Sequence, residues 1–110
     1  MGLASARSIA LAGLEGHLVE IEAFTGGGLP RTVLVGLADT ALYESRDRCR
    51  AAIASSGFRW PDKLLTINLL PATLPKAGSH YDLGIVAAIL GAMDLVPAHA
   101  TADAVLLGEL

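Results

Sequence analysis

The side chains with the clearest catalytic potential are a serine, a histidine and an aspartate that stand almost side by side, Ser79, His80 and Asp82. These are the three side-chain types of a hydrolase triad, in which the histidine moves a proton and the carboxylate orients it. Near neighbours that lead into a helix point in divergent directions, so this spacing does not predict an aligned triad. The sequence instead favours a loop followed by a helix, with Asp82 as the N-cap that accepts hydrogen bonds from the first-turn amides.

The sequence lacks the usual patterns for metal ions and nucleotides. Its three histidines stand far apart, without a His-x-x-x-His or Cys-x-x-Cys partner, so surface or capping positions are expected for them. The glycines at 26–28 lead through Leu29 and Pro30 into a strand, whereas a Walker A loop needs Gly-Lys-Ser/Thr at the start of a helix. We therefore predict no metal ion and no cofactor in this segment.

Basic residues are concentrated in one stretch of a chain whose formal net charge is −3. Six basic and two acidic residues lie between positions 46 and 76, whereas the rest of the chain carries two basic and nine acidic residues. Arg46 and Arg50 share one face of a predicted helix, and the chain is expected to bring Arg59 and Lys63 near its end. These four side chains form a candidate contact surface for DNA or a partner domain; the alternative is a solvated helix face.

The elements that position these residues begin with a predicted hairpin. Residues 5–14 and 17–24 are two extended segments that a Glu15-Gly16 turn joins, and residues 18–23 of the second segment alternate with the period of a strand. The run 32–37 is nearly all apolar, which predicts a short strand buried on both faces.

Two helices and two more strands follow. A helix over 40–56 is expected to begin after an N-cap at Asp39 and to end at Gly57. The remaining elements are a strand over 63–70, a helix from 83 to about 94 that is hydrophobic all round and therefore central, and a last strand over 104–107.

This order predicts an α/β (α+β) fold with a mixed sheet and helices on one face. With 110 residues and 53% hydrophobic content, the chain is long enough for one compact domain. It ends in a predicted strand without a polar tail. We therefore expect neighbouring strands to be missing, so that the domain is truncated at its C-terminus.

Cysteine content and hydropathy bear on the compartment. Cys49 is the only cysteine and stands in a helical pattern, which predicts a buried hydrophobe and no internal disulfide. The longest uncharged apolar run, 83–93, is too short to span a bilayer. We expect a cytoplasmic protein without a membrane anchor.

Six segments in order resemble one family. They are Val-Leu-Val-Gly-Leu-Ala-Asp at 33–39, Glu-Ser-Arg-Asp-Arg-Cys-Arg-Ala-Ala-Ile at 44–53, Ser-Gly-Phe at 56–58, Thr-Ile-Asn-Leu-Leu-Pro-Ala at 66–72, Leu-Pro-Lys-Ala-Gly at 74–78 and Tyr-Asp-Leu at 81–83. Together they resemble the magnesium-chelatase-like AAA+ ATPases of the ComM/YifB type. The N-terminal domain of that family is similar to the catalytic domain of Lon protease and to the second domain of ribosomal protein S5.

The resemblance implies that residues 1–110 are the N-terminal part of a Lon-like domain, and that an AAA+ ATPase module lies beyond residue 110. It also implies that the parent uses ATP and Mg²⁺, works as a homo-oligomeric ring and drives branch migration of DNA during natural transformation. The partners expected for this segment are the rest of its own chain, other copies and DNA.

A comparison with Lon peptidases weakens the case for catalysis. In those enzymes the nucleophilic serine follows Pro-Lys-Asp-Gly-Pro; the corresponding segment here is 75–79, which places His80 at the nucleophile position. The activating lysine is expected beyond residue 110. The resemblance therefore implies a non-catalytic accessory domain. The alternatives are a residual serine peptidase or amidase in which Ser79 substitutes, and a purely structural ring-assembly module.

Overall fold

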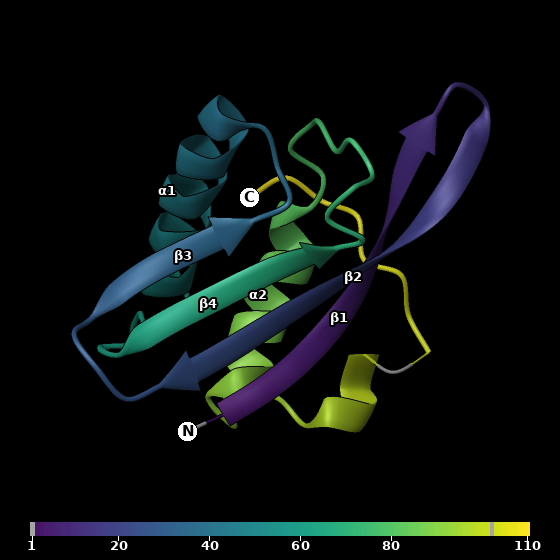
Figure 1. The fold of residues 1–110 in the computed structure, drawn as a ribbon. Coiled ribbons are helices and arrows are strands. Elements are labelled where there is room, and N and C mark those ends of the chain that lie inside the picture. Colours follow the sequence, from purple (N-terminus) through teal and green to yellow (C-terminus); the bar gives the residue numbers. More distant parts are fainter. Residues whose placement is uncertain (1, 102) are drawn as a thin grey trace.

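The computed structural model describes residues 2–101 and 103–110, and its strands form one mixed sheet in the order β1-β2-β4-β3 (Figure 1). The hairpin strands β1 and β2 and the pair β2–β4 are antiparallel, whereas β3 and β4 are parallel. The elements are β1 (Gly2–Ala12), β2 (Glu15–Gly26), β3 (Arg31–Val35), α1 (Asp39–Ser55), β4 (Leu64–Leu70), α2 (Asp82–Ala92) and a 3-10 turn at Ala98–Thr101.

One face of this sheet holds the core. Strand residues alternate between faces, and the register places the buried ones of β1, β2 and β4 on the same side. Helix α2 packs on β1 and β2, and both helices cover that side (Figure 1). The buried hydrophobic residues of the strands are Ala6, Ala10, Val19, Ile21, Ala23, Leu65, Ile67 and Leu69. The predicted mixed sheet with helices on one face is confirmed, and so is the central position of α2.

The prediction for β3 was wrong about its burial. The strand lies at the edge of the sheet, pairs with β4 alone and has half-buried or exposed residues, with Val35 42% exposed. It ends one residue before Gly36, whose φ is +107°. A Cβ at this position would lie 2.4 Å from the carbonyl oxygen of Leu69. Glycine is therefore required where the chain turns from β3 towards α1.

Both predicted helix caps were wrong. The N-cap of α1 is Ala38 and that of α2 is Tyr81, and neither forms a side-chain capping bond. Asp39 and Asp82 are instead the first residues of their helices, where a carboxylate still interacts favourably with the helix dipole. The end of α1 was predicted correctly, because Gly57 follows it with a φ of +85°.

The hairpin is confirmed, but its turn is two residues earlier than predicted. Ala12 pairs with Glu15, so Gly13 and Leu14 make the turn, and Gly13 has a φ of +63°. Strand β4 pairs with β2 only from Glu20 onward. The distal half of the hairpin therefore extends beyond the sheet, as Figure 1 shows.

The predicted last strand over 104–107 does not form as a strand. The segment still runs along β1, where the Leu106 amide donates to the Arg7 carbonyl at 2.8 Å. The Gly108 amide donates to the His80 carbonyl, and the Gly108 carbonyl accepts from the Leu83 amide, each at 3.0 Å. The segment thus links the free edge of β1 to the start of α2. No helix in the described part of the chain combines the length and hydrophobicity needed to cross a membrane.

Candidate functional site

Four arginines line one surface hollow of about 370 Å³. Arg46 and Arg50 stand one turn apart on α1, Arg31 begins β3, and Arg59 lies in the connection from α1 to β4. The sequence-based grouping of Arg46, Arg50 and Arg59 thus corresponds to one place in the structure. Arg31 was missed, because only the parallel pairing of β3 with β4 brings it opposite Leu64, beside that connection.

Trp60 forms part of the wall of this hollow and is held on two sides. The Arg50 guanidinium lies over its ring, 5.7 Å from the centroid, a cation–π arrangement. The indole Nε1 donates to Oγ1 of Thr32 at 3.2 Å. These contacts fix the indole beside the arginines and link α1, the connection and β3.

Acidic side chains offset part of the positive charge. Arg46 donates through Nε and Nη2 to Oδ1 of Asp47 at 3.2 and 3.1 Å, and its guanidinium lies 5.3 Å from the Tyr43 ring centroid. Asp62 lines the hollow beside Arg59. Four guanidinium groups against two carboxylates leave this hollow positively charged.

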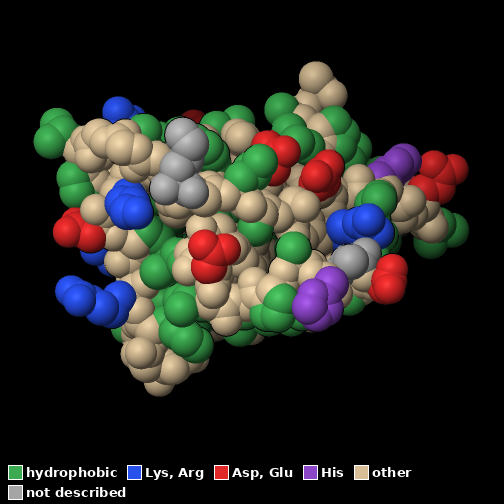
Figure 2. Space-filling model, turned by 90° about the horizontal axis from the view of Figure 1, so that it is seen from below, with side chains coloured by type: hydrophobic (Ala, Val, Ile, Leu, Met, Phe, Trp, Pro, Cys, Tyr) green, Lys and Arg blue, Asp and Glu red, His purple; other side chains and the backbone are tan. Residues whose placement is uncertain are grey.

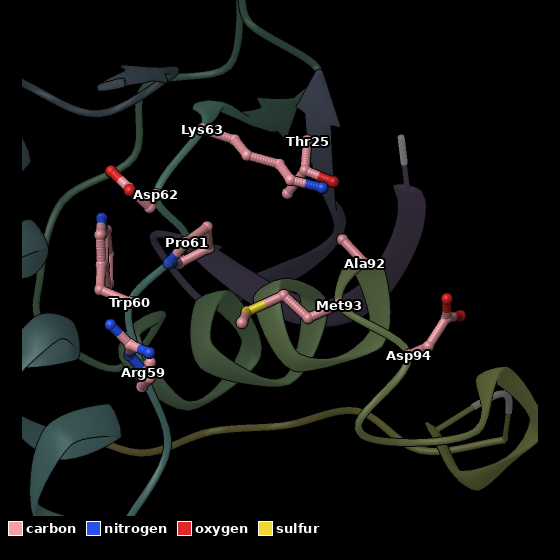
Figure 3. Close-up of a pocket in the computed structure, with 9 residues that line it drawn as sticks. All are labelled: Thr25, Arg59, Trp60, Pro61, Asp62, Lys63, Ala92, Met93 and Asp94. Atoms are coloured by element: carbon pink, nitrogen blue, oxygen red, sulfur yellow. The ribbon is translucent and has the colours of Figure 1, made fainter. Parts of the chain in front are cut away.

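A second hollow of about 440 Å³ lies on the other side of the 59–62 connection (Figure 3). Lys63 reaches across it towards Thr25, and Asp94 stands at its far rim. Lys63 is therefore separated from the arginine hollow by the connection. We call the five residues Arg31, Arg46, Arg50, Arg59 and Lys63 the basic surface. Figure 2 shows that most visible Lys and Arg side chains gather towards one end of the face it views.

The histidine at the predicted nucleophile position is part of the framework. The Nε2 of His80 lies 2.7 Å from the Ile9 carbonyl of β1; because a carbonyl only accepts, this nitrogen carries the proton and donates it. The imidazole also packs on Tyr81, with ring centroids 4.1 Å apart. Ser79 uses its carbonyl to accept from the Asp82 amide at 3.3 Å. Ser79, His80 and Asp82 are close together in the sequence, but the His80 ring bonds to the Ile9 carbonyl and the Asp82 carboxylate bonds to Ser45 and Arg48.

Asp82 is the centre of a buried polar cluster. Its Oδ1 accepts from Ser45 Oγ at 2.7 Å and from Arg48 Nη2 at 3.1 Å, and its Oδ2 accepts from Arg48 Nε at 2.5 Å and from the Leu110 amide at 3.2 Å. The hydrogen bonds to Asp82 raise the pKa of Arg48. This cluster joins α1, α2 and the end of the described chain. Sequence reasoning missed it, because Ser45 and Arg48 are 37 and 34 residues away from Asp82 in the chain.

The side chains of Cys49 and Lys76 are both buried. Cys49 is fully buried, and burial raises the pKa of its thiol to about 12. Its Sγ donates to the Asp82 carbonyl at 3.6 Å. Burial lowers the pKa of Lys76, whose Nζ donates to the carbonyls of Pro71 at 2.5 Å and Leu74 at 2.8 Å. Both side chains hold the fold together, and among the described residues no cluster of His, Cys, Asp or Glu could bind a metal ion.

Comparisons with known proteins give the family. A family model described as subunit ChlI of Mg-chelatase matches residues 19–110. Over its whole length the chain is 52% identical to an uncharacterized protein of Mycobacterium tuberculosis and 41% identical to the uncharacterized protein YifB of Escherichia coli, covering 22% of each. It is 42% identical over 98 residues, 89% of the chain, to the competence protein ComM of Haemophilus influenzae, of which this covers 19%.

The chain thus spans about a fifth of the length of these relatives. The family match extends over most of the chain and includes most of the second hairpin strand, both helices, the arginine hollow and the Asp82 cluster. The chain therefore belongs to the magnesium-chelatase-like family described by subunit ChlI of Mg-chelatase.

Proposed function

We propose that this chain is a non-catalytic accessory domain of an AAA+ ATPase and that it guides DNA across its basic surface. The parent protein binds ATP and Mg²⁺ outside these 110 residues and uses hydrolysis to process DNA in the cytoplasm, by branch migration during natural transformation. Two findings support this proposal. One is membership of the magnesium-chelatase-like family, and the other is similarity to a protein named for competence.

The observation that carries the proposal is the convergence of Arg31, Arg46, Arg50 and Arg59 on one hollow of an otherwise acidic chain. Guanidinium groups match phosphate oxygens in charge and in paired hydrogen-bond geometry. Arginines that bind phosphates in this way supply sequence-independent affinity for DNA. Such affinity suits a domain that guides DNA past a motor.

The contacts of His80 and Asp82 argue against a hydrolase triad made of Ser79, His80 and Asp82. The protonated Nε2 of His80 is committed to the Ile9 carbonyl, and the carboxylate of Asp82 to Arg48 and Ser45. A proton relay through Ser79 would require both side chains to leave these bonds.

The proposal is tested in the intact parent protein by reversing two charges of the basic surface, Arg46→Glu with Arg50→Glu. DNA affinity, followed by fluorescence anisotropy across a salt series, should fall. The slope of log affinity against log salt should become shallower by about 0.9 for each phosphate that the variant no longer neutralises. DNA-independent ATP hydrolysis should survive.

Arg7→Glu is the matched control, because Arg7 is an exposed arginine on the opposite, uncovered face of the sheet. It should leave affinity and slope unchanged. Failed ring assembly with normal DNA binding would assign the arginines to a subunit interface. Unchanged binding and assembly would make them a solvated face, and either result would refute DNA guidance.

A further inference from the structure

The tip of the β1–β2 hairpin, residues 11–18, exposes a group of apolar side chains. Leu11 is 74% exposed, Leu18 56%, and Leu14 in the turn is fully exposed. This part of the hairpin is a two-stranded ribbon, because β4 pairs with β2 only from Glu20 onward. Such ribbons are marginally stable in water, and clustered exposed leucines mark an interaction site.

An apolar hollow of about 660 Å³ opens at the same end of the sheet. It lies where β3 and β4 end, and its walls include Val35, Leu37, Ala72, Leu74 and Pro75. Leu11 is the hairpin residue that lines the hollow, whereas Leu14, in the turn of the same hairpin, does not line it. The 71–79 loop and the hairpin rise side by side from this end of the molecule (Figure 1).

The tip and the hollow match in charge as well as in hydrophobicity. Lys76 lines the hollow, is only 4% exposed and is satisfied by two backbone carbonyls that carry no net charge. Glu15 follows Leu14 in the tip and its side chain is 83% exposed. A carboxylate brought to the hollow would supply the counter-charge that Lys76 lacks among these partners.

We propose that the hairpin tip of one copy docks in the apolar hollow of a second copy, with Leu14 inside the hollow and Glu15 facing Lys76. Each copy carries both surfaces, so the contact is either reciprocal between two copies or heterologous and repeated from copy to copy. A repeated heterologous contact closes into a ring when its rotation allows closure. The contact leaves the basic surface free, because Arg31 stands at the start of β3 and the hollow lies beyond its other end. It therefore holds whether or not the basic surface binds DNA.

The first test substitutes Leu14→Asp in the intact parent protein. Leu14 is fully exposed, so the melting temperature of each chain should be unchanged while the assembly, measured by light scattering after gel filtration, falls to a smaller mass. Leu29→Asp is the matched control, because Leu29 is 84% exposed but lies in the 27–30 loop, outside both surfaces. An unchanged assembly mass for the Leu14 variant would overturn the proposal.

The second test uses oxidative cross-linking in a parent without other accessible cysteines; Cys49 is buried and can remain. Leu14→Cys and Ala77→Cys, the latter at an exposed residue of the hollow, are prepared as separate proteins. Mixed together, they should form a disulfide between copies, whereas neither should cross-link alone. Cross-linking of the Leu14 variant with itself would indicate a tip-to-tip contact and overturn the docking of the tip in the hollow. A protein that carries both Leu14→Cys and Ala77→Cys serves as a further check. If its two cysteines cross-link only within one chain, the contact between copies is overturned.

Discussion

Arg48 on α1 and Asp82 at the start of α2 form a buried, two-point ion pair, with Nε to Oδ2 at 2.5 Å and Nη2 to Oδ1 at 3.1 Å. The Asp82 side chain is 1% exposed and that of Arg48 26%. A carboxylate buried to this degree is tolerated because it is paired and hydrogen-bonded through both oxygens. The pair therefore fixes how the two helices pack on each other, and through the Leu110 amide Asp82 also holds the end of the chain.

Replacing Asp82 by Ala should lower the free energy of unfolding by about 3 kcal/mol, the lower end of the range for breaking a buried ion pair. Arg48 is partly exposed and can regain water, which keeps the loss at that end. Urea unfolding of the 110-residue chain measures it. Asp47→Ala is the control, because Asp47 is exposed, and its loss should stay below about 1 kcal/mol. A loss of about 1 kcal/mol at Asp82 would be that of a simple helix cap.

Cys49 should resist alkylation by iodoacetamide at pH 8 in the folded chain and react readily in urea, because only the thiolate reacts and burial raises the pKa of this thiol to about 12. The pH dependence of stability has a definite sign. Between the unfolded pKa of about 9 and the folded value, the unfolded chain loses the proton first, so stability falls as pH rises.

This alkaline loss should be smaller in Cys49→Ala when urea midpoints at pH 8 and pH 10 are compared. The comparison must be made against the natural chain, since Tyr81 and Lys76 also have shifted pKa values. Rapid alkylation of the folded chain would contradict the buried position of Cys49.

Gly36→Ala should cost about 3 kcal/mol of stability, because the residue would be held at φ +107° and its Cβ would lie 2.4 Å from the Leu69 carbonyl oxygen. Gly27→Ala is the matched control: nothing lies within 4 Å of a Cβ built at that position. Thermal melts of both variants measure the difference. Equal melting temperatures would mean that the turn between β3 and α1 can relax without cost.

The elements of this fold could be predicted from the sequence because each has a local signal. Alternation identifies the hairpin and β4, and Gly57 marks the end of α1 by its freedom at positive φ. The caps predicted at Asp39 and Asp82 were wrong, since both residues are the first of their helices. An acidic residue before a helical pattern predicts a cap locally, but Asp82 has partners on α1 that no local pattern reveals.

Part of the arginine hollow could be predicted from the sequence, namely the residues that lie close together in the chain. Arg46 and Arg50 could be grouped because helical spacing places them on one face, and Arg59 follows them closely in the chain. Arg31 lies beside these arginines only because β3 pairs with β4. Lys63 lines the second hollow, on the other side of the 59–62 connection. An apolar run such as β3 also cannot reveal whether its strand is central or at an edge, since that depends on the order of strands in the sheet.

Trp60 should report directly on occupancy of the basic surface. It is the only tryptophan of the chain, lines both hollows and lies under the Arg50 guanidinium. A phosphate that draws Arg50 away, or a base that stacks beside the indole, changes the surroundings of the ring. Titrating the 110-residue chain with an oligonucleotide should therefore shift or quench its emission in a saturable way, and added salt should reverse the change because counterions compete for the arginines.

Two variants make this titration specific. Arg50→Glu should abolish the response, since it removes the guanidinium over the ring and adds a charge that repels phosphate, whereas Arg7→Glu should leave it intact. Anisotropy of a labelled oligonucleotide, measured in parallel, reports binding anywhere on the chain. If anisotropy rises while Trp60 emission stays constant, DNA binds at another surface. If both respond but Arg50→Glu changes neither, the arginine hollow is not where DNA binds, and DNA reaches Trp60 from the side of Lys63 and Thr25.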